Sequence, residues 1–136
     1  MAIHWNTEKL NKYLSRIDGA IAEGRYNLAV RLANRCLRQY YREFIQTNNI
    51  PTEPMSAENV RIMALSIVRY LNSYFRKYEI PYSERRLVFI SLASNIIFLA
   101  SVNMSEEHSY PTDKALATYA RENVSSIIGY LSRYFS

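Results

Sequence analysis

The chain contains few residues that interrupt helices and almost none that cross-link small domains. Among its 136 residues there are only three glycines, four prolines and one cysteine. Scarce glycine and proline favour long, uninterrupted elements. The single cysteine, Cys36, excludes an internal disulfide and a cysteine-based metal cluster, which agrees with a reducing cytoplasm. A chain of this length buries a core without such cross-links, so residues 1–136 are expected to form one domain.

Charged residues are absent from one long segment, which runs from Leu87 to Ser105. A membrane span needs about 20 mainly apolar residues, and serine and asparagine side chains interrupt this segment repeatedly. We therefore interpret it as a central helix that is buried on most sides. The N-terminal residues also lack the apolar stretch and cleavage pattern of a secretion signal. No membrane association is expected, and the predicted location is the cytoplasm.

Apolar residues recur at helical spacing and predict an all-α protein, with no strand-like alternation between turn residues. The expected helices span residues 6–22, 25–47, 56–78, 83–102 and 112–134. Their expected N-caps are Asn6 or Thr7, then Ser56, Ser83 and Thr112. Short connections favour antiparallel neighbours. The predicted fold is therefore an antiparallel, up-and-down bundle of about five helices.

Chain breaks and packing faces follow from the same pattern. Gly24 is expected to separate the first two helices, and the segment 48–51 to end the second. The buried face of the second helix is predicted to contain Tyr26, Ala29, Val30, Ala33, Leu37, Tyr40 and Phe44. The packing face of the last helix is predicted to contain Leu116, Tyr119, Ala120, Ile127, Tyr130, Leu131 and Tyr134.

The charge balance is basic, with 17 Lys and Arg against 12 Asp and Glu and a formal net charge of +5. Four arginines on the second predicted helix follow one another at spacings of four, three and four: Arg31, Arg35, Arg38 and Arg42. At 100° per residue they fall within about 60° of one another, opposite the predicted buried face. We call this set the arginine stripe. It contains no acid, so it is either a solvated face or the binding surface for an anionic partner, such as RNA or an acidic protein.

Tyrosine is abundant, with 12 residues. Tyr70, Tyr74 and Tyr78 recur every four residues on the third predicted helix. Such a row is suited to stacking bases, although aromatic rows at helical spacing are more often core or dimer-interface residues. The tyrosine-rich faces exceed what one small core needs, so a homodimer is expected.

The common catalytic motifs are missing. There is no glycine-rich phosphate loop, no His-Glu-x-x-His motif and no metal-ligand spacing of Cys and His. We therefore expect neither a metal nor a cofactor. His108 lies in a polar segment beside Glu106 and Glu107, and a single loop histidine is more often inert than catalytic.

Two segments, taken together, resemble HEPN domains, the helical bundles of prokaryotic toxin, abortive-infection and nucleotidyltransferase-partner proteins. The first segment, 22–37, reads AEGRYNLAVRLANRCL and has the family's small turn, aromatic residue and spaced alanines. The second segment, 103–110, follows the fourth predicted helix and reads NMSEEHSY. Active members carry an arginine there, then four to six residues, then His-x-Tyr. His108 and Tyr110 match the second half of that motif.

The family's arginine is absent from this sequence. Counting back from His108 leads to Asn103, Val102 or Ser101. The resemblance implies that the arginine holds the scissile phosphate while the histidine assists attack by a ribose 2′-hydroxyl. A neutral side chain lacks the charge and the fork for that role. The sequence thus departs from the family at the residue that its nuclease centre needs.

Three functions are compatible with these residues. The leading hypothesis is a degenerate, non-catalytic HEPN-like protein in prokaryotic defence or a toxin–antitoxin pair, which binds RNA or an acidic partner through the arginine stripe. The second is a metal-independent ribonuclease that uses His108 with an arginine from elsewhere, such as Arg121 or a second subunit. The third is a helical adaptor. Gly24-x-Tyr26-x-x-Ala29 also occurs in tetratricopeptide repeats, but no second repeat is present.

Overall fold

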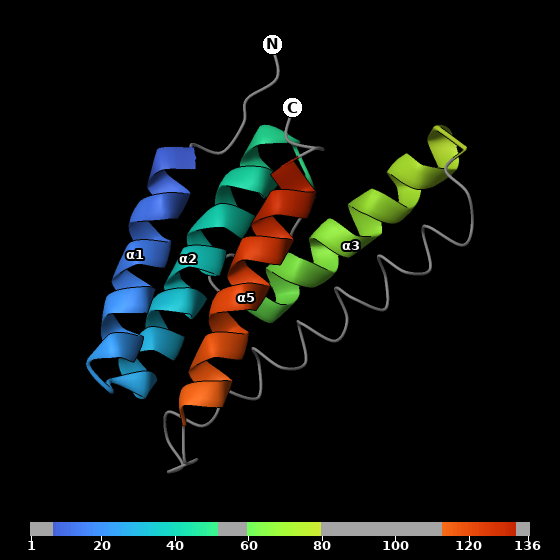
Figure 1. The fold of residues 1–136 in the computed structure, drawn as a ribbon. Coiled ribbons are helices and arrows are strands. Elements are labelled where there is room, and N and C mark those ends of the chain that lie inside the picture. The colour runs from blue at the N-terminus through green and yellow to red at the C-terminus, as the bar shows by residue number, and fades with distance from the viewer. Residues whose placement is uncertain (1–6, 52–59, 80–112, 133–136) are drawn as a thin grey trace.

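The computed structural model describes residues 7–51, 60–79 and 113–132. These residues form four helices: α1 (Thr7–Ala22), α2 (Tyr26–Thr47), α3 (Val60–Lys77) and α5 (Lys114–Leu131) (Figure 1). No strand occurs in the described ranges. The all-α prediction is therefore confirmed, with four helices described against about five expected. The predicted helix 83–102 lies outside the described residues.

The four helices are not related by a simple up-and-down order. Two contacts show that α1 and α2 are antiparallel. Lys9 bonds to Glu43, and Tyr13, one turn after Lys9, bonds to Gln39, which lies one turn before Glu43. α5 runs in the same direction as α2 (Figure 1). α3 is tilted relative to the other three, and its C-terminal end extends away from them (Figure 1).

The turn after α1 forms at the predicted glycine. Gly24 has φ 74°, a conformation that glycine adopts readily because it has no Cβ atom. Its amide donates to the carbonyl of Ile21, and the amide of Arg25 donates to the carbonyl of Ala20, at 2.8 Å. These two bonds make a Schellman cap. Asn49, with φ 53°, ends α2 in the same way, since the amide of Ile50 donates to the carbonyl of Ile45.

The N-cap of α5 differs from the sequence prediction. The carboxylate of Asp113 accepts a hydrogen bond from the amide of Leu116 at 2.8 Å, so the cap is Asp113 and not Thr112. Both residue types are good caps. The aspartate also places a negative charge at the positive end of the helix dipole, which a threonine does not. The predicted caps Asn6, Ser56 and Ser83 lie outside the described residues.

α2 is the central helix, because it packs against α1, α3 and α5. All but one of the residues predicted for its buried face are buried, and Tyr26 is half-buried. Further buried residues lie on both flanks of that face, namely Leu32, Asn34, Cys36, Tyr41 and Ile45. A helix with three neighbours needs this wider apolar surface.

The packing face of α5 includes one wrong prediction. Tyr119 is 50% exposed, because at 100° per residue it lies well to the side of Ala120, which is fully buried. The buried face instead contains Ala117, Ala120, Asn123, Val124, Ile127, Ile128 and Leu131. Tyr134 lies outside the described residues. Among the described helices, none is long and apolar enough to cross a membrane.

Candidate functional site

The arginine stripe lies on the side of α2 that faces away from its buried surface. Arg31, Arg35 and Arg42 are exposed, as predicted, whereas Arg38 is half-buried. Within the part of the chain that the structure describes, none of the four forms an ion pair. The nearest acid along the helix, Glu43, bonds to Lys9 on α1 at 3.0 Å. The positive charge of the stripe is thus left without a neighbouring carboxylate on α2.

Arg38 differs from the other three arginines in its surroundings. Its Nη2 atom donates to Oδ1 of Asn34 at 3.4 Å, and Asn34 is only 8% exposed. Its Nε atom is buried and has no hydrogen-bond partner among the described residues. A buried donor without a partner costs about 1–3 kcal/mol. Within the described ranges, the bond to Asn34 thus holds Arg38 at the base of the stripe, while its Nε atom has no acceptor.

α1 adds two cations next to the stripe. Lys9 and Tyr13 contact α2. At 100° per residue, Arg16 lies within about 60° of both, whereas Lys12 lies about 60° from Lys9 and about 100° from Tyr13. Lys12 and Arg16 are both exposed. On α2, Gln39, which Tyr13 contacts, lies about 40° from Arg35 and about 60° from Arg42. From this helical geometry we infer that Lys12 and Arg16 flank the arginine stripe, and we call these six residues the basic face.

The sequence pattern alone did not identify Lys12 and Arg16 as site residues. On α1 they are two ordinary exposed cations among polar neighbours. Their placement beside the stripe depends on which edge of α1 meets α2. That edge is defined by Tyr13, whose hydroxyl donates to Oε1 of Gln39 at 2.7 Å. Tyr13 and Gln39 each place a polar group at the edge of the apolar face of their helix. This position is a sequence signal that could have indicated the pairing of α1 with α2.

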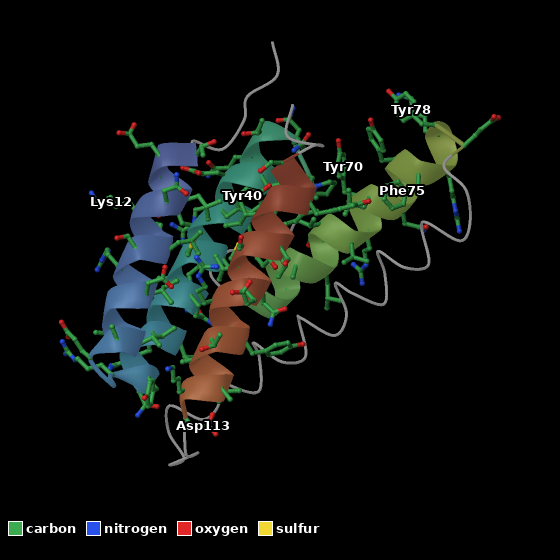
Figure 2. All side chains as sticks on the ribbon, viewed as in Figure 1. Lys12, Tyr40, Tyr70, Phe75, Tyr78 and Asp113 are labelled. Carbon is green, nitrogen blue, oxygen red and sulfur yellow. The ribbon has the colours of Figure 1, made fainter. Side chains whose placement is uncertain are left out.

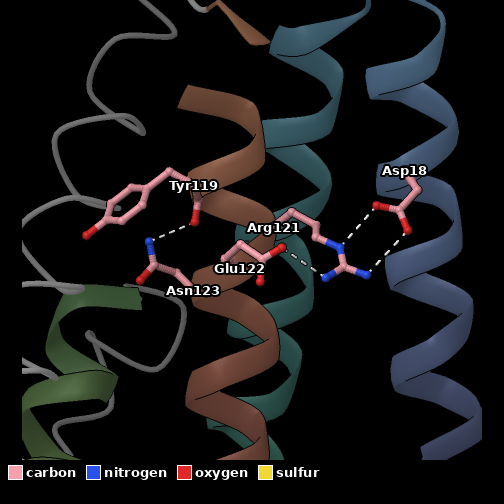
Figure 3. Close-up of polar contacts among 5 residues, drawn as sticks. All are labelled: Asp18, Tyr119, Arg121, Glu122 and Asn123. Atoms are coloured by element: carbon pink, nitrogen blue, oxygen red, sulfur yellow. Dashed lines mark hydrogen bonds and ion pairs between the residues drawn. The ribbon is translucent and has the colours of Figure 1, made fainter. Parts of the chain in front are cut away.

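Arg121, considered as a replacement for the missing family arginine, is held by two carboxylates (Figure 3). Its Nε and Nη2 atoms donate to the two oxygens of Asp18, at 3.0 and 3.4 Å. Its Nη1 atom donates to Glu122 at 3.2 Å. The bonds to Asp18 are the main reason that the pKa of Arg121 is raised. This guanidinium links α1 to α5, and its N–H groups are already bonded to the carboxylates of Asp18 and Glu122.

The other predicted catalytic residues, His108 and Tyr110, lie outside the described residues. In the described ranges, no three side chains of His, Cys, Asp or Glu come together in a way that could hold a metal ion. Cys36 is buried, and desolvation raises the pKa of its thiol to about 12. A thiol with that pKa is not a nucleophile at neutral pH.

The three tyrosines predicted for the third helix have different environments, and Tyr78 lies one residue beyond the end of α3. Tyr70 is half-buried: its hydroxyl donates to Oδ1 of Asn48 at 3.2 Å, and its ring packs edge-on against Phe44 with a centroid distance of 6.0 Å. Tyr74 is also half-buried and contacts Tyr70. Tyr78 is 55% exposed. Of the predicted core or dimer-interface role, the core part is confirmed for Tyr70, and the dimer-interface part stays a prediction for Tyr78.

The chain matches no family model, no curated protein and no solved structure.

Proposed function

We propose that this chain is a non-catalytic binding protein of the HEPN-like type, acting in prokaryotic defence or a toxin–antitoxin pair, and that its basic face binds RNA. The observation that carries the proposal is the arginine stripe itself. Three exposed arginines and one anchored arginine line one side of α2, without an acid within the stripe. Like charges at this spacing repel one another, and phosphates of a bound strand relieve that repulsion.

The dimensions of the stripe favour an extended ligand over a single small anion. Arg31 and Arg42 are eleven residues apart, which corresponds to about 16 Å along the helix axis. Guanidinium groups bind phosphate through two parallel hydrogen bonds. A row of such groups fits a chain of phosphates, and Lys12 and Arg16 widen the row on the side of α1. An acidic protein surface is the alternative partner.

The HEPN-like part of the proposal draws on the segment 22–37. Gly24 forms the tight turn between α1 and α2. Ala29 and Ala33 are fully buried on α2, where small side chains let neighbouring helices approach closely. These are the features on which the resemblance of that segment depends. The second segment, 103–110, lies outside the described residues.

The ribonuclease alternative needs an arginine to complete a site at His108. Arg121 is a poor source, because Asp18 and Glu122 already bind its guanidinium. A second subunit remains the other source in that hypothesis. The occupied state of Arg121 is one reason for favouring binding over cleavage.

The proposal is tested by removing two exposed arginines of the stripe. Arg31→Ala with Arg35→Ala is compared with a matched control, Arg25→Ala with Lys114→Ala, which removes the same charge from exposed positions outside the basic face. Binding of labelled single-stranded RNA is measured by fluorescence anisotropy at several salt concentrations. We expect the affinity of the stripe variant to fall about tenfold or more, and its salt slope to decrease by roughly 0.7 for each phosphate that is no longer neutralised.

The control pair should bind within about twofold of the parent, since charge at the N-terminal ends of α2 and α5 is not part of the surface. Circular dichroism checks that both variants fold. Equal weakening of binding in the two pairs would mean that only net charge matters. A parent protein that does not bind RNA would overturn the proposal and leave an acidic protein as the partner.

A further inference from the structure

The exposed tyrosine at the end of α3 lies on the helix face that is elsewhere used for packing. At 100° per residue, Tyr78 is within about 20° of Ile67 and Leu71. Both of those residues are only 1% exposed, whereas Tyr78 is 55% exposed. The reason is that this end of α3 extends away from α1, α2 and α5 (Figure 2). A large aromatic ring is therefore presented to solvent at a position where the helix pattern calls for a partner.

Among the described residues, Tyr78 ends a connected row of aromatic rings. From the rings of Tyr40 and Phe44 on α2 it continues through Tyr70 and Tyr74. The rings of Tyr74 and Tyr78 are the closest pair, with centroids 4.5 Å apart and planes inclined by 40°. Tyr74 thus supports Tyr78 from within the molecule. A ring held in this way is a pre-arranged platform for another flat group.

The charges around the platform favour one kind of occupant. α3 contains no Asp or Glu, and Arg76 and Lys77 are exposed beside Tyr78. Glu79 is the one acid in the described residues next to the ring in sequence. A second copy of this chain in a two-fold dimer would bring the same cations face to face. A single-stranded nucleic acid instead offers flat bases to the ring and phosphates to the cations.

We propose that Tyr78, supported by Tyr74, stacks a base of single-stranded nucleic acid while Lys77 contacts its phosphate backbone. This inference rests on the proposed function and specifies the form of the ligand. The Nζ atom of Lys77 lies over the Tyr78 ring, 5.4 Å from its centroid. An exposed cation–π contact is weaker than base stacking on an aromatic ring. A base therefore displaces the lysine, whose charge then turns to the phosphate.

The experiment compares two polyanions, of which only one has bases. The probes are a single-stranded oligoadenylate on the order of ten nucleotides long and inorganic polyphosphate of similar charge. The variants are Tyr78→Leu, Tyr78→Trp and Tyr119→Leu. Tyr119 is the matched control, because it is a similarly exposed tyrosine on α5. Sedimentation velocity and circular dichroism measure self-association and folding for each variant.

We expect Tyr78→Leu to weaken oligoadenylate binding by roughly 5- to 160-fold, the range for one stacked base, and to leave polyphosphate binding unchanged. Tyr78→Trp should restore oligoadenylate binding, and Tyr119→Leu should match the parent. If the parent binds neither probe, the proposal that the basic face binds RNA is wrong. If the parent binds both and Tyr78→Leu weakens neither or both equally, the stacking inference alone is wrong. Loss of self-association in Tyr78→Leu, with unchanged oligoadenylate binding, would assign the ring to a second copy.

Discussion

At the scale of single residues, the buried centre of α2 contains three groups that ionise only in alkali. Burial raises the pKa of Cys36 from 9.0 to about 12. Burial also raises the pKa of the Tyr40 and Tyr41 phenols above the usual 10.0. All three groups are neutral in the folded protein at neutral pH. They lie side by side in the helix that contacts every other described helix, so their ionisation is linked to unfolding.

The sign of this linkage predicts alkaline destabilisation. The unfolded chain releases these protons from about pH 9 upward, while the folded chain retains them. The stability is therefore complete below pH 9 and decreases as the pH rises towards 12, by about 1.4 kcal/mol per pH unit for each group ionised only in the unfolded state. Urea titrations at closely spaced pH values measure this decrease. Cys36→Ala should decline less steeply just above pH 9; an identical slope would show that the thiol does not contribute.

At the scale of helices and turns, Gly19 and Gly24 should respond in opposite ways to replacement by alanine. Gly19 is exposed inside α1, and an added Cβ would meet no atom within 4 Å. Gly19→Ala should stabilise the protein by about 0.5–1 kcal/mol, because alanine is the better helix former. Gly24 has φ 74°, so Gly24→Ala should destabilise it by about 1–2 kcal/mol. Chemical denaturation of the two variants compares them directly; stabilisation by Gly24→Ala would contradict the cap geometry.

The first two helices and their ends could be predicted closely from local sequence signals. The predicted bounds of the first two helices agree with α1 and α2 to within one residue, because Gly24 and Asn49 each favour the left-handed conformation that ends a helix. The cap of α5 was misplaced because Thr112 and Asp113 are adjacent and both suited to capping. Tyr119 was misplaced because the position of a packing stripe depends on neighbouring helices. The half-burial of Arg38 has the same origin.

The surface that α1 and α2 share was less predictable than either helix. The arginine stripe could be found from spacing alone, since all four residues lie on one helix. Lys12 and Arg16 could not be assigned to it, because their relation to the stripe depends on the contact between Tyr13 and Gln39. A surface formed by two helices requires the pairing of those helices, and one sequence without its fold does not specify that.

At the scale of the whole molecule, the proposed function implies that the protein alone is a poor ribonuclease. Removal of a fixed positive partner for the transition-state phosphate typically costs about 100- to 1,000-fold in rate. Asn103 and Ser101 are neutral, and Arg121 is bound to Asp18 and Glu122. Purified protein and a His108→Ala variant should both leave labelled single-stranded RNA intact. Robust cleavage by the parent that is absent from the variant would support the enzyme alternative. The expected homodimer stays a prediction, which light scattering tests.

The contact between α1 and α5 also has a consequence for how the protein is made. Arg121 and Asp18 are 103 residues apart, so this contact cannot form until α5 has left the ribosome. At about 5–20 residues per second, α5 is completed some 4–17 s after α2. During that interval, the α1–α2 hairpin exposes the apolar surface that α5 later covers. The nascent chain therefore passes through a state in which chaperone binding or premature association competes with the arrival of the last helix.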